Sequence, residues 1–174
     1  MRRVVTAMTA AGKSVFVSDD AVEPITIAAA PGTEFHQIWG ADAIVQLPSD
    51  GSAPKAQGYF PREDGFRFGF FTVPPAGVTP PADLDMAAAL AEVNEKLPGM
   101  MDVQEMDNPG MHRTDTVDFI VVVSGEVSLE LDDGNTVHLR AGDCVVQNGT
   151  RHAWRSTSNA PCVMAVALVG ARRT

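Results

Sequence analysis

The pattern of apolar runs and turn residues is most regular in the last third of the chain. Short runs rich in β-branched residues are separated by clusters of Gly, Asn, Asp and Ser, which favour tight turns. The runs are DFIVVVSG, EVSLELDDGNTVHLR, GDCVVQNG, HAWRS and CVMAVALV. Many short strands joined by such turns are typical of a closed or sandwiched antiparallel barrel. The pattern therefore predicts an all-β fold for this part of the chain.

The first hundred residues show shorter apolar runs, which proline and glycine interrupt. This punctuation favours short strands joined by turns. We expect strands within residues 4–8, 14–17, 26–30 and 66–73. Residues 47–61 are rich in Pro, Gly, Ser and Ala. Their apolar positions show neither the two-residue period of a strand nor the 3.6-residue period of a helix, so we predict a long surface loop there.

Over residues 83–97 the apolar positions recur with the period of a helix. They lie three or four residues apart, which places them on one side of a helix. These positions are Met86, Leu90, Val93 and Leu97. Prolines precede the segment and a Pro-Gly pair follows it, so they set its limits. We expect one amphipathic helix that packs on the core, with a role as a lid over the barrel as the alternative.

The composition indicates a single globular domain. A chain of 174 residues with 45% hydrophobic and 20% charged residues can bury a substantial core. We expect one domain over residues 1–174, with strands, loop and helix in residues 1–100 and the barrel core in residues 105–170. The net charge of −9 repels nucleic acid and anionic membrane surfaces, so neither is an expected partner.

The few cysteines and the lack of a long apolar segment predict a cytoplasmic protein. Cys144 and Cys162 lie in apolar stretches and are expected to be buried thiols, and a disulfide between them stays open. No apolar run reaches the roughly 18 residues that a membrane helix needs. His36, within EFHQIW, is expected to be a satisfied strand histidine, and a place near a pocket entrance is the alternative.

Two histidines and an aspartate could converge inside the barrel. In an extended segment from residue 112, His112, Thr114 and Asp118 point to the same side, because side chains alternate with period two. His152 begins another strand and shares a side with Trp154. If the two strands are neighbours, His112, Asp118 and His152 meet, and two imidazoles with a carboxylate suit a divalent metal. The alternative for Asp118 is a hydrogen bond to a nearby threonine hydroxyl.

Two motifs in the last third resemble those of the cupin superfamily. The first is GMHRTDTVDFIVVVSGE, and the second is GDCVVQNGTRHAW. The matching positions are His112, Asp118 and Gly125 in the first motif and Gly142, Gly149 and His152 in the second. The resemblance implies a double-stranded β-helix, the jelly-roll barrel of cupins, with N-terminal strands and one amphipathic helix added to it.

The same resemblance implies a site, and the sequence departs from the usual motif within it. Thr114 stands where a second histidine is usual, Asp118 replaces a glutamate, and Gln147 replaces a proline. The implied metal ligands are His112, Asp118 and His152, around one divalent ion such as Fe, Mn, Ni or Zn. These residues and Thr114, which could bind a metal-held water or a substrate oxygen, form the expected catalytic set. Trp154, Ile120 and Gln147 are expected to line the pocket.

The resulting prediction is a metal-dependent cupin enzyme that acts on a small organic molecule. Resemblance to cupins suggests dioxygenase, decarboxylase, or isomerase and dehydratase chemistry. A metal-free cupin that binds a small ligand without turning it over is the alternative. Metal-free acid–base catalysis by His112 or His152 is a third possibility. We also expect a homodimer, because extra N-terminal strands leave sheet edges that need covering.

Overall fold

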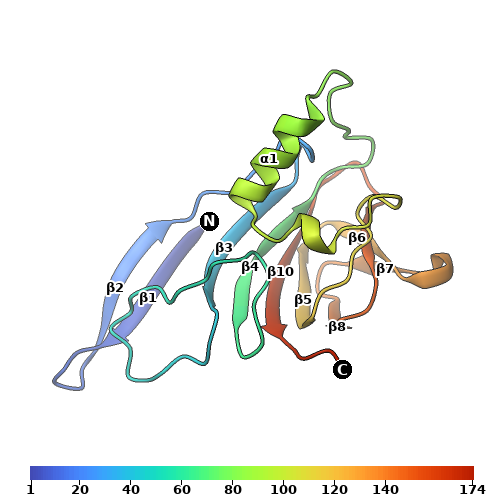
Figure 1. The fold of residues 1–174 in the computed structure, drawn as a ribbon. Coiled ribbons are helices and arrows are strands. Elements are labelled where there is room, and N and C mark those ends of the chain that lie inside the picture. The colour runs from blue at the N-terminus through green and yellow to red at the C-terminus, as the bar shows by residue number, and fades with distance from the viewer.

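The computed structural model describes residues 1–174 and contains ten strands and one α-helix (Figure 1). The first four strands are β1 (Arg2–Met8), β2 (Ser14–Ala21), β3 (Glu34–Ala41) and β4 (Phe66–Val73). Helix α1 (Met86–Lys96) and a short 3-10 turn (Met101–Val103) follow. The remaining strands are β5 (Thr116–Ser124), β6 (Glu126–Glu130), β7 (Thr136–Arg140), β8 (Cys144–Asn148), β9 (Ala153–Ser156) and β10 (Cys162–Gly170), with a 3-10 turn (Asp132–Gly134) between β6 and β7.

Two antiparallel sheets make the barrel. The larger sheet has the strand order β3-β4-β10-β5-β8, and the smaller sheet has the order β7-β6-β9. Apolar residues from both sheets form one buried cluster, whose members are Val73, Ile120, Val122, Val127, Leu129, Leu139, Cys162 and Met164. The arrangement is a double-stranded β-helix, so the predicted jelly-roll fold is confirmed.

Helix α1 begins and ends close to the predicted limits. The side chain of Asp85 accepts hydrogen bonds from the Ala87 and Ala88 amides and so caps the first turn. Glu92 and Lys96 pair along the helix and also bind the backbone of residues 26–28. The strand expected at residues 26–30 is wrong, because these residues form turns that the helix side chains hold. No helix is long and apolar enough to span a membrane.

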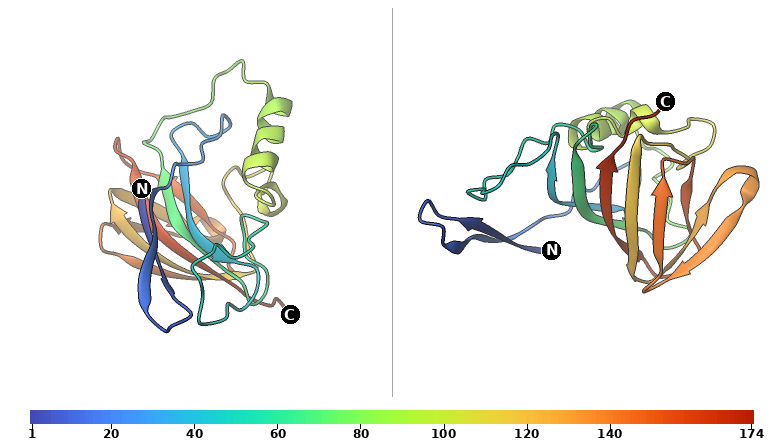
Figure 2. Two further views of the ribbon diagram at one scale, coloured as in Figure 1. Left: turned by 90° about the vertical axis from the view of Figure 1, so that its left-hand side faces the viewer. Right: turned by 90° about the horizontal axis from the view of Figure 1, so that it is seen from below.

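Strands β1 and β2 form a separate hairpin beside the barrel (Figure 2). They pair only with each other. The hairpin meets the rest of the chain through a few hydrogen bonds, such as that from the Met8 amide to the Ser49 carbonyl. Its Phe16 side chain is 80% exposed. The hairpin is therefore an extension of the fold that adds no residue to the central core.

The two cysteines lie in different environments, and both are free thiols. Cys162 is buried, as predicted, but Cys144 is exposed, so the prediction of a second buried thiol is wrong. The strand register explains the difference. Val145 and Gln147 of β8 point inward opposite Ile120 and Asp118, which leaves Cys144 on the outer side.

Candidate functional site

A cavity of about 550 Å³ opens on the inner side of the larger sheet. Apolar side chains from five strands and helix α1 make most of its wall, among them Phe35, Phe71, Val93, Ile120, Trp154 and Leu168. Its polar side chains include His36, His112, Thr114, Asp118 and His152. The cavity therefore combines a large apolar wall with a few polar groups, which is the usual composition of a small-molecule site.

The predicted parity along β5 is confirmed. Thr116, Asp118 and Ile120 are buried on the inner side, whereas Phe119 and Val121 are exposed on the outer side. Thr114 precedes the strand and keeps the inward orientation. Its hydroxyl lies 2.7 Å from that of Thr116, and both side chains are buried. Thr114 is thus engaged with a neighbour on the same wall.

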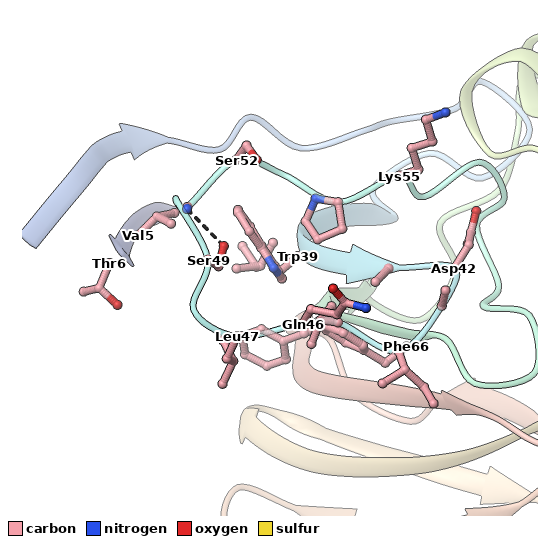
Figure 3. A pocket seen from close by; sticks show the side chains of 18 of the residues that line it. Val5, Thr6, Trp39, Asp42, Gln46, Leu47, Ser49, Ser52, Lys55 and Phe66 are labelled. Carbon is pink, nitrogen blue, oxygen red and sulfur yellow. Dashed lines mark hydrogen bonds between the residues drawn. The ribbon is translucent and has the colours of Figure 1, made fainter. Parts of the chain in front are cut away.

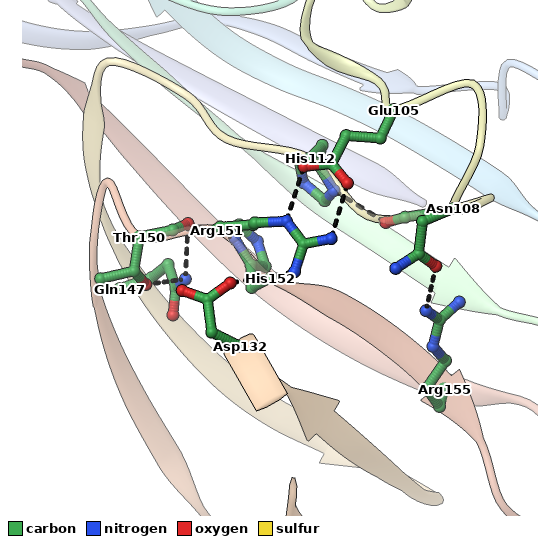
Figure 4. A network of polar contacts seen from close by, with 10 residues as sticks. Glu105, Asn108, His112, Asp132, Gln147, Thr150, Arg151, His152 and Arg155 are labelled. Atoms are coloured by element: carbon green, nitrogen blue, oxygen red, sulfur yellow. Dashed lines mark hydrogen bonds and ion pairs between the residues drawn. The ribbon is translucent and has the colours of Figure 1, made fainter. Parts of the chain in front are cut away.

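His112 and His152 form a pair, as the sequence suggested (Figure 4). Each backbone amide donates to the other residue's carbonyl, at 3.0 and 2.9 Å, and the ring centroids are 4.2 Å apart. His112 Nδ1 lies 3.0 Å from the Gly110 carbonyl oxygen, and His152 Nδ1 lies 2.9 Å from that of Thr150. A carbonyl can only accept, so each Nδ1 carries the hydrogen. Each neutral ring therefore keeps an unprotonated Nε2 with a free lone pair.

Burial keeps both imidazoles neutral. It lowers the pKa of His112, and it lowers the pKa of His152 to about 4 with the help of the neighbouring His112. Trp154 stands edge-on to the His152 ring, with the centroids 6.0 Å apart. Near neutral pH the pair is therefore two uncharged bases beside an aromatic wall.

A network of ion pairs holds the segment that carries His112 (Figure 4). Arg151 binds both carboxylate oxygens of Glu105 at 2.6 Å and also reaches Asp132 at 2.9 Å. Arg155 donates to the Pro109 carbonyl at 2.7 Å and to Asn108 at 3.1 Å. These contacts tie residues 105–110 to the strand that follows His152. The two arginines thus position the histidine pair.

Asp118 stands in the wall without a full set of partners. Its side chain is buried, and its Oδ1 atom has no hydrogen-bond partner. Burial raises the pKa of Asp118 to about 6, and the Thr116 hydroxyl opposes this shift. The alternative considered from the sequence, a hydrogen bond to a threonine, therefore satisfies only one of the two carboxylate oxygens. Oδ1 is left free to accept a hydrogen bond from a ligand.

Tyr59 is a site residue that sequence reasoning missed. It lies in the stretch predicted to be a loop, where no period points to a buried role. Its ring packs edge-on against Phe35, with centroids 5.5 Å apart, and lines the cavity. Burial raises the pKa of its hydroxyl, and the Asp118 carboxylate raises it further. Asp118 therefore shares its part of the wall with Tyr59.

The predicted metal ligands are only partly brought together. His112 and His152 are in contact, but no group of three His, Cys, Asp or Glu side chains lies close enough to hold a metal ion. The Asp118 carboxylate raises the pKa of Tyr59, which lines the same cavity. The donors therefore do not fit a preassembled three-ligand centre, and the divalent metal stays a prediction.

The other predicted residues divide between the cavity and its support. Trp154 and Ile120 line the cavity. Gln147 lies outside the lining, and its amide donates to the Thr150 hydroxyl at 2.6 Å and to the Thr150 carbonyl at 3.3 Å. It stabilises the turn before His152. His36 lines the cavity and has a buried Nδ1 without a partner, so it is not the fully satisfied strand histidine that the sequence suggested.

Residues 99–169 match the protein family described as "Cupin domain". The chain is also similar to Phomopsin biosynthesis cluster protein C' of Diaporthe leptostromiformis, with 43% identity over 60 residues, or 34% of this chain and 32% of that protein. Oryzines biosynthesis cluster protein J of Aspergillus oryzae is 50% identical over 50 residues, or 29% of this chain and 28% of that protein. The matches thus span about a third of these relatives' length.

Solved structures with a similar arrangement of strands share little sequence with the chain. The polyketide cyclase RemF from Streptomyces resistomycificus has a TM-score of 0.46 and 17% identity, covering 84% of this chain and 72% of that one. A Cupin 2 conserved barrel domain protein from Salinispora arenicola has a TM-score of 0.42 and 11% identity, covering 87% and 90%.

Proposed function

The chain belongs to the cupin superfamily through the domain of residues 99–169, and we propose that it is an enzyme that moves a proton on a small organic molecule. The molecule binds in the cavity that the two histidines line. The observation that carries the proposal is the His112–His152 pair, two buried neutral imidazoles whose Nδ1 atoms both face backbone carbonyls. Such rings can only act through Nε2, as bases.

The chemistry of the pair favours isomerisation or dehydration. A C–H or O–H proton of the substrate passes to Nε2 of one histidine, and that ring becomes an imidazolium. Burial disfavours the cation, as the low pKa of His152 indicates. The imidazolium therefore readily returns its proton, either to another substrate atom or to a departing hydroxyl group. The first outcome is an isomerisation, and the second is a dehydration.

The cavity wall indicates what the substrate looks like. Its volume of about 550 Å³ suits a molecule of one to three rings, and most of the wall is apolar. The free Oδ1 of Asp118 would accept a hydrogen bond from a hydroxyl or amine of the substrate. We expect a largely apolar molecule with at least one such donor, oriented by Asp118 toward the histidine pair.

The relatives support a role in small-molecule biosynthesis. The proteins of Diaporthe leptostromiformis and Aspergillus oryzae bear the names of the phomopsin and oryzines biosynthesis clusters. Their similarity to this chain covers about a third of each protein. The proposal is therefore limited to the class of reaction, and the product is left to experiment.

Proton exchange on a model ketone tests the proposal directly. The probe is 6-hydroxy-2-tetralone, a two-ring ketone with one hydroxyl donor, and NMR follows exchange of its α-protons in D₂O. We expect the protein to accelerate exchange in the presence of EDTA. His112→Gln and His152→Gln should each lower the rate by about 100-fold or more. His138→Gln is the matched control, because His138 is partly exposed on β7 and binds Glu126.

The same experiment separates the other candidates. Binding of the ketone without exchange would favour the metal-free ligand-binding protein. Exchange that EDTA abolishes would favour the metal-dependent enzyme predicted from the sequence, for which the two free Nε2 atoms offer good metal ligands. Elemental analysis of the wild type and of His112→Ala would then decide, because a bound metal should be stoichiometric in the first and lost in the second.

A further inference from the structure

An unused hydrogen-bond acceptor and an unused donor line the reacting cavity together. The acceptor is Oδ1 of Asp118, a residue that is 4% exposed and has no hydrogen-bond partner for this atom. The donor is the hydroxyl of Tyr59, which forms no hydrogen bond with another residue. Both residues belong to the cavity lining. A buried polar group without a partner in its own chain is rare and calls for a ligand.

The two groups are neighbours that do not bond to each other. The Asp118 carboxylate raises the pKa of Tyr59, and a Coulomb interaction falls with distance, so the two groups lie near each other. Both their free atoms face one cavity. A single hydroxyl group between them can satisfy both, because its oxygen accepts one hydrogen bond while its hydrogen donates another.

Tyr59 is held firmly, although it lies outside any helix or strand. Its amide donates to the Pro98 carbonyl at 2.8 Å. The carbonyl of the preceding residue, Gly58, accepts from Nε and Nη2 of the buried Arg67, at 3.0 and 2.9 Å. A donor that is fixed before the ligand arrives loses little freedom on binding. The loop thus presents the Tyr59 hydroxyl as a fixed part of the wall.

Aromatic rings surround this donor and acceptor. Phe35 stands edge-on to Tyr59, with the centroids 5.5 Å apart, and stacks on Phe71 at 5.2 Å. Trp154 lines the same cavity beside His152. Aromatic side chains favour other flat rings through offset stacking and edge-to-face contacts. The wall therefore suits a flat ring that carries a hydroxyl group.

The other large pocket of the chain lacks such a pair. It is a groove of about 850 Å³ beneath the N-terminal hairpin, and Trp39, Asp42 and Phe66 are among its lining residues (Figure 3). Asp42 is the only carboxylate of this lining, and it accepts from the Gln57 amide at 2.9 Å and pairs with Arg67. Of the two pockets, only the inner cavity therefore offers a buried carboxylate oxygen without a partner.

We infer that Tyr59 and Asp118 together bind a hydroxyl group on an aromatic ring of the substrate. Tyr59 donates to the oxygen of this hydroxyl, and the hydroxyl donates to Oδ1 of Asp118. The inference rests on the proposed function for the role of the cavity, and it narrows the substrate to a hydroxylated aromatic molecule. A charged amine does not fit, because an ammonium group has no lone pair to accept from Tyr59.

Binding of two small aromatic probes tests the inference without any turnover. The probes are 2-naphthol and naphthalene, which differ by one hydroxyl, and calorimetry on the full chain gives each dissociation constant. The wild type should bind 2-naphthol at least about 10-fold more tightly. Tyr59→Phe and Asp118→Asn should each remove most of this preference and leave naphthalene binding within about twofold. Asp133→Asn is the matched control, because Asp133 is exposed outside the cavity, and it should keep the wild-type preference.

Two further readouts separate a shared hydroxyl from a general loss of structure. Because both residues act on one group, the double variant should lose less 2-naphthol affinity than the product of the two single losses. Tyr59 is the only tyrosine of the chain, so 3-fluorotyrosine gives a single ¹⁹F NMR signal, which 2-naphthol should shift as it binds. Independent losses, or 2-naphthol binding that leaves this signal unchanged, would overturn the inference. Circular dichroism checks that each variant is folded.

Failure of this subsite and failure of the proposed function have different signatures. No binding of 2-naphthol, or equal affinity for the two probes, would overturn the subsite. The function would still stand if the protein exchanged the α-protons of 2-tetralone and 6-hydroxy-2-tetralone equally fast in EDTA. A preference for 2-naphthol that depends on Tyr59 and Asp118, without proton exchange on either ketone, would support the subsite and overturn the function.

Discussion

The two sides of the larger sheet reverse the usual distribution of polar and apolar residues. The inner side buries Arg67, Thr116 and Asp118, whereas the outer side exposes Phe119 and Val121. Buried polar groups cost stability unless hydrogen bonds satisfy them, and exposed apolar groups gain nothing from water. The inner side therefore lines a ligand cavity, and the outer side leaves apolar side chains exposed to water.

The largest effect is expected at Arg67, the most extensively bonded polar residue of the inner side. Its guanidinium pairs with Asp42 and donates to the carbonyls of Ala41, Gly58 and Phe66. Arg67→Ala would leave these partly buried acceptors unpaired. We expect a loss of about 3–5 kcal/mol in the free energy of unfolding, measured by urea denaturation.

A solvent-exposed ion pair of the same chain serves as the control for Arg67. Arg2 and Asp19 pair on the hairpin, where both side chains are more than half exposed. Arg2→Ala should leave the free energy of unfolding almost unchanged, because water screens an exposed pair. Equal costs for the two substitutions would show that burial does not distinguish the inner polar residues.

The buried Asp118 carboxylate should lower the free energy of unfolding of the wild type. A neutral side chain at this position should raise it. The folded-state pKa of about 6 lies above the unfolded value near 3.9, so between these values the folded protein binds more protons. The carboxylate therefore destabilises the fold above about pH 6, and the penalty disappears as the pH falls below about 4. Asp118→Asn should raise the free energy of unfolding by about 3 kcal/mol at pH 7.5, with little change at pH 3.5. Urea denaturation at the two pH values measures this.

Lower pH favours folding through Asp118 but disfavours it through the histidine pair. The Asp118 variant must therefore be compared with the wild type at each pH. The pKa of His152 falls to about 4 in the folded protein, below its unfolded value near 6.5. Its contribution to stability is therefore lost as the pH falls through that range. The difference between the wild type and Asp118→Asn cancels the histidine contribution. A difference that does not shrink at low pH would contradict the assigned burial of Asp118.

The sequence predicts the fold and one half of the site well. Period-two alternation identified which β5 residues point inward, and the glycine turns identified the hairpins of the barrel. The pairing of His112 with His152 follows from the two motif strands being neighbours. These features are local, or depend on one strand contact, and a sequence pattern can specify both.

Distances within the site are harder to predict. Alternation places Asp118 and His112 on one side but does not specify their separation, because regular β5 begins only at Thr116 and the chain before it makes an isolated bridge. Tyr59 comes from an unpatterned loop and reaches the wall only through tertiary packing. The exposure of Cys144 depends on strand register, which an apolar run without clear alternation leaves open.

Thr114 provides a test with a smaller effect on the inner side. The sequence suggested a catalytic role, whereas its hydroxyl contacts that of Thr116 at 2.7 Å. Thr114→Val would leave the Thr116 hydroxyl buried without this partner and should cost about 1–3 kcal/mol. We expect proton exchange on the ketone to change less than tenfold. A loss as large as that of His152→Gln would restore Thr114 to the catalytic set.

The smallest effect is expected for a Val→Thr substitution on the outer side of the larger sheet, compared with the same substitution on its inner side. Val146 is 58% exposed on the outer side of β8, and Val122 is 1% exposed on the inner side of β5. Val→Thr keeps the shape and adds a hydroxyl. Val146→Thr should change the unfolding free energy by less than about 0.5 kcal/mol, whereas Val122→Thr should cost about 1–3 kcal/mol. Urea denaturation of both variants beside the wild type measures the difference. Equal costs at the two positions would mean that the outer side is already covered within the single chain.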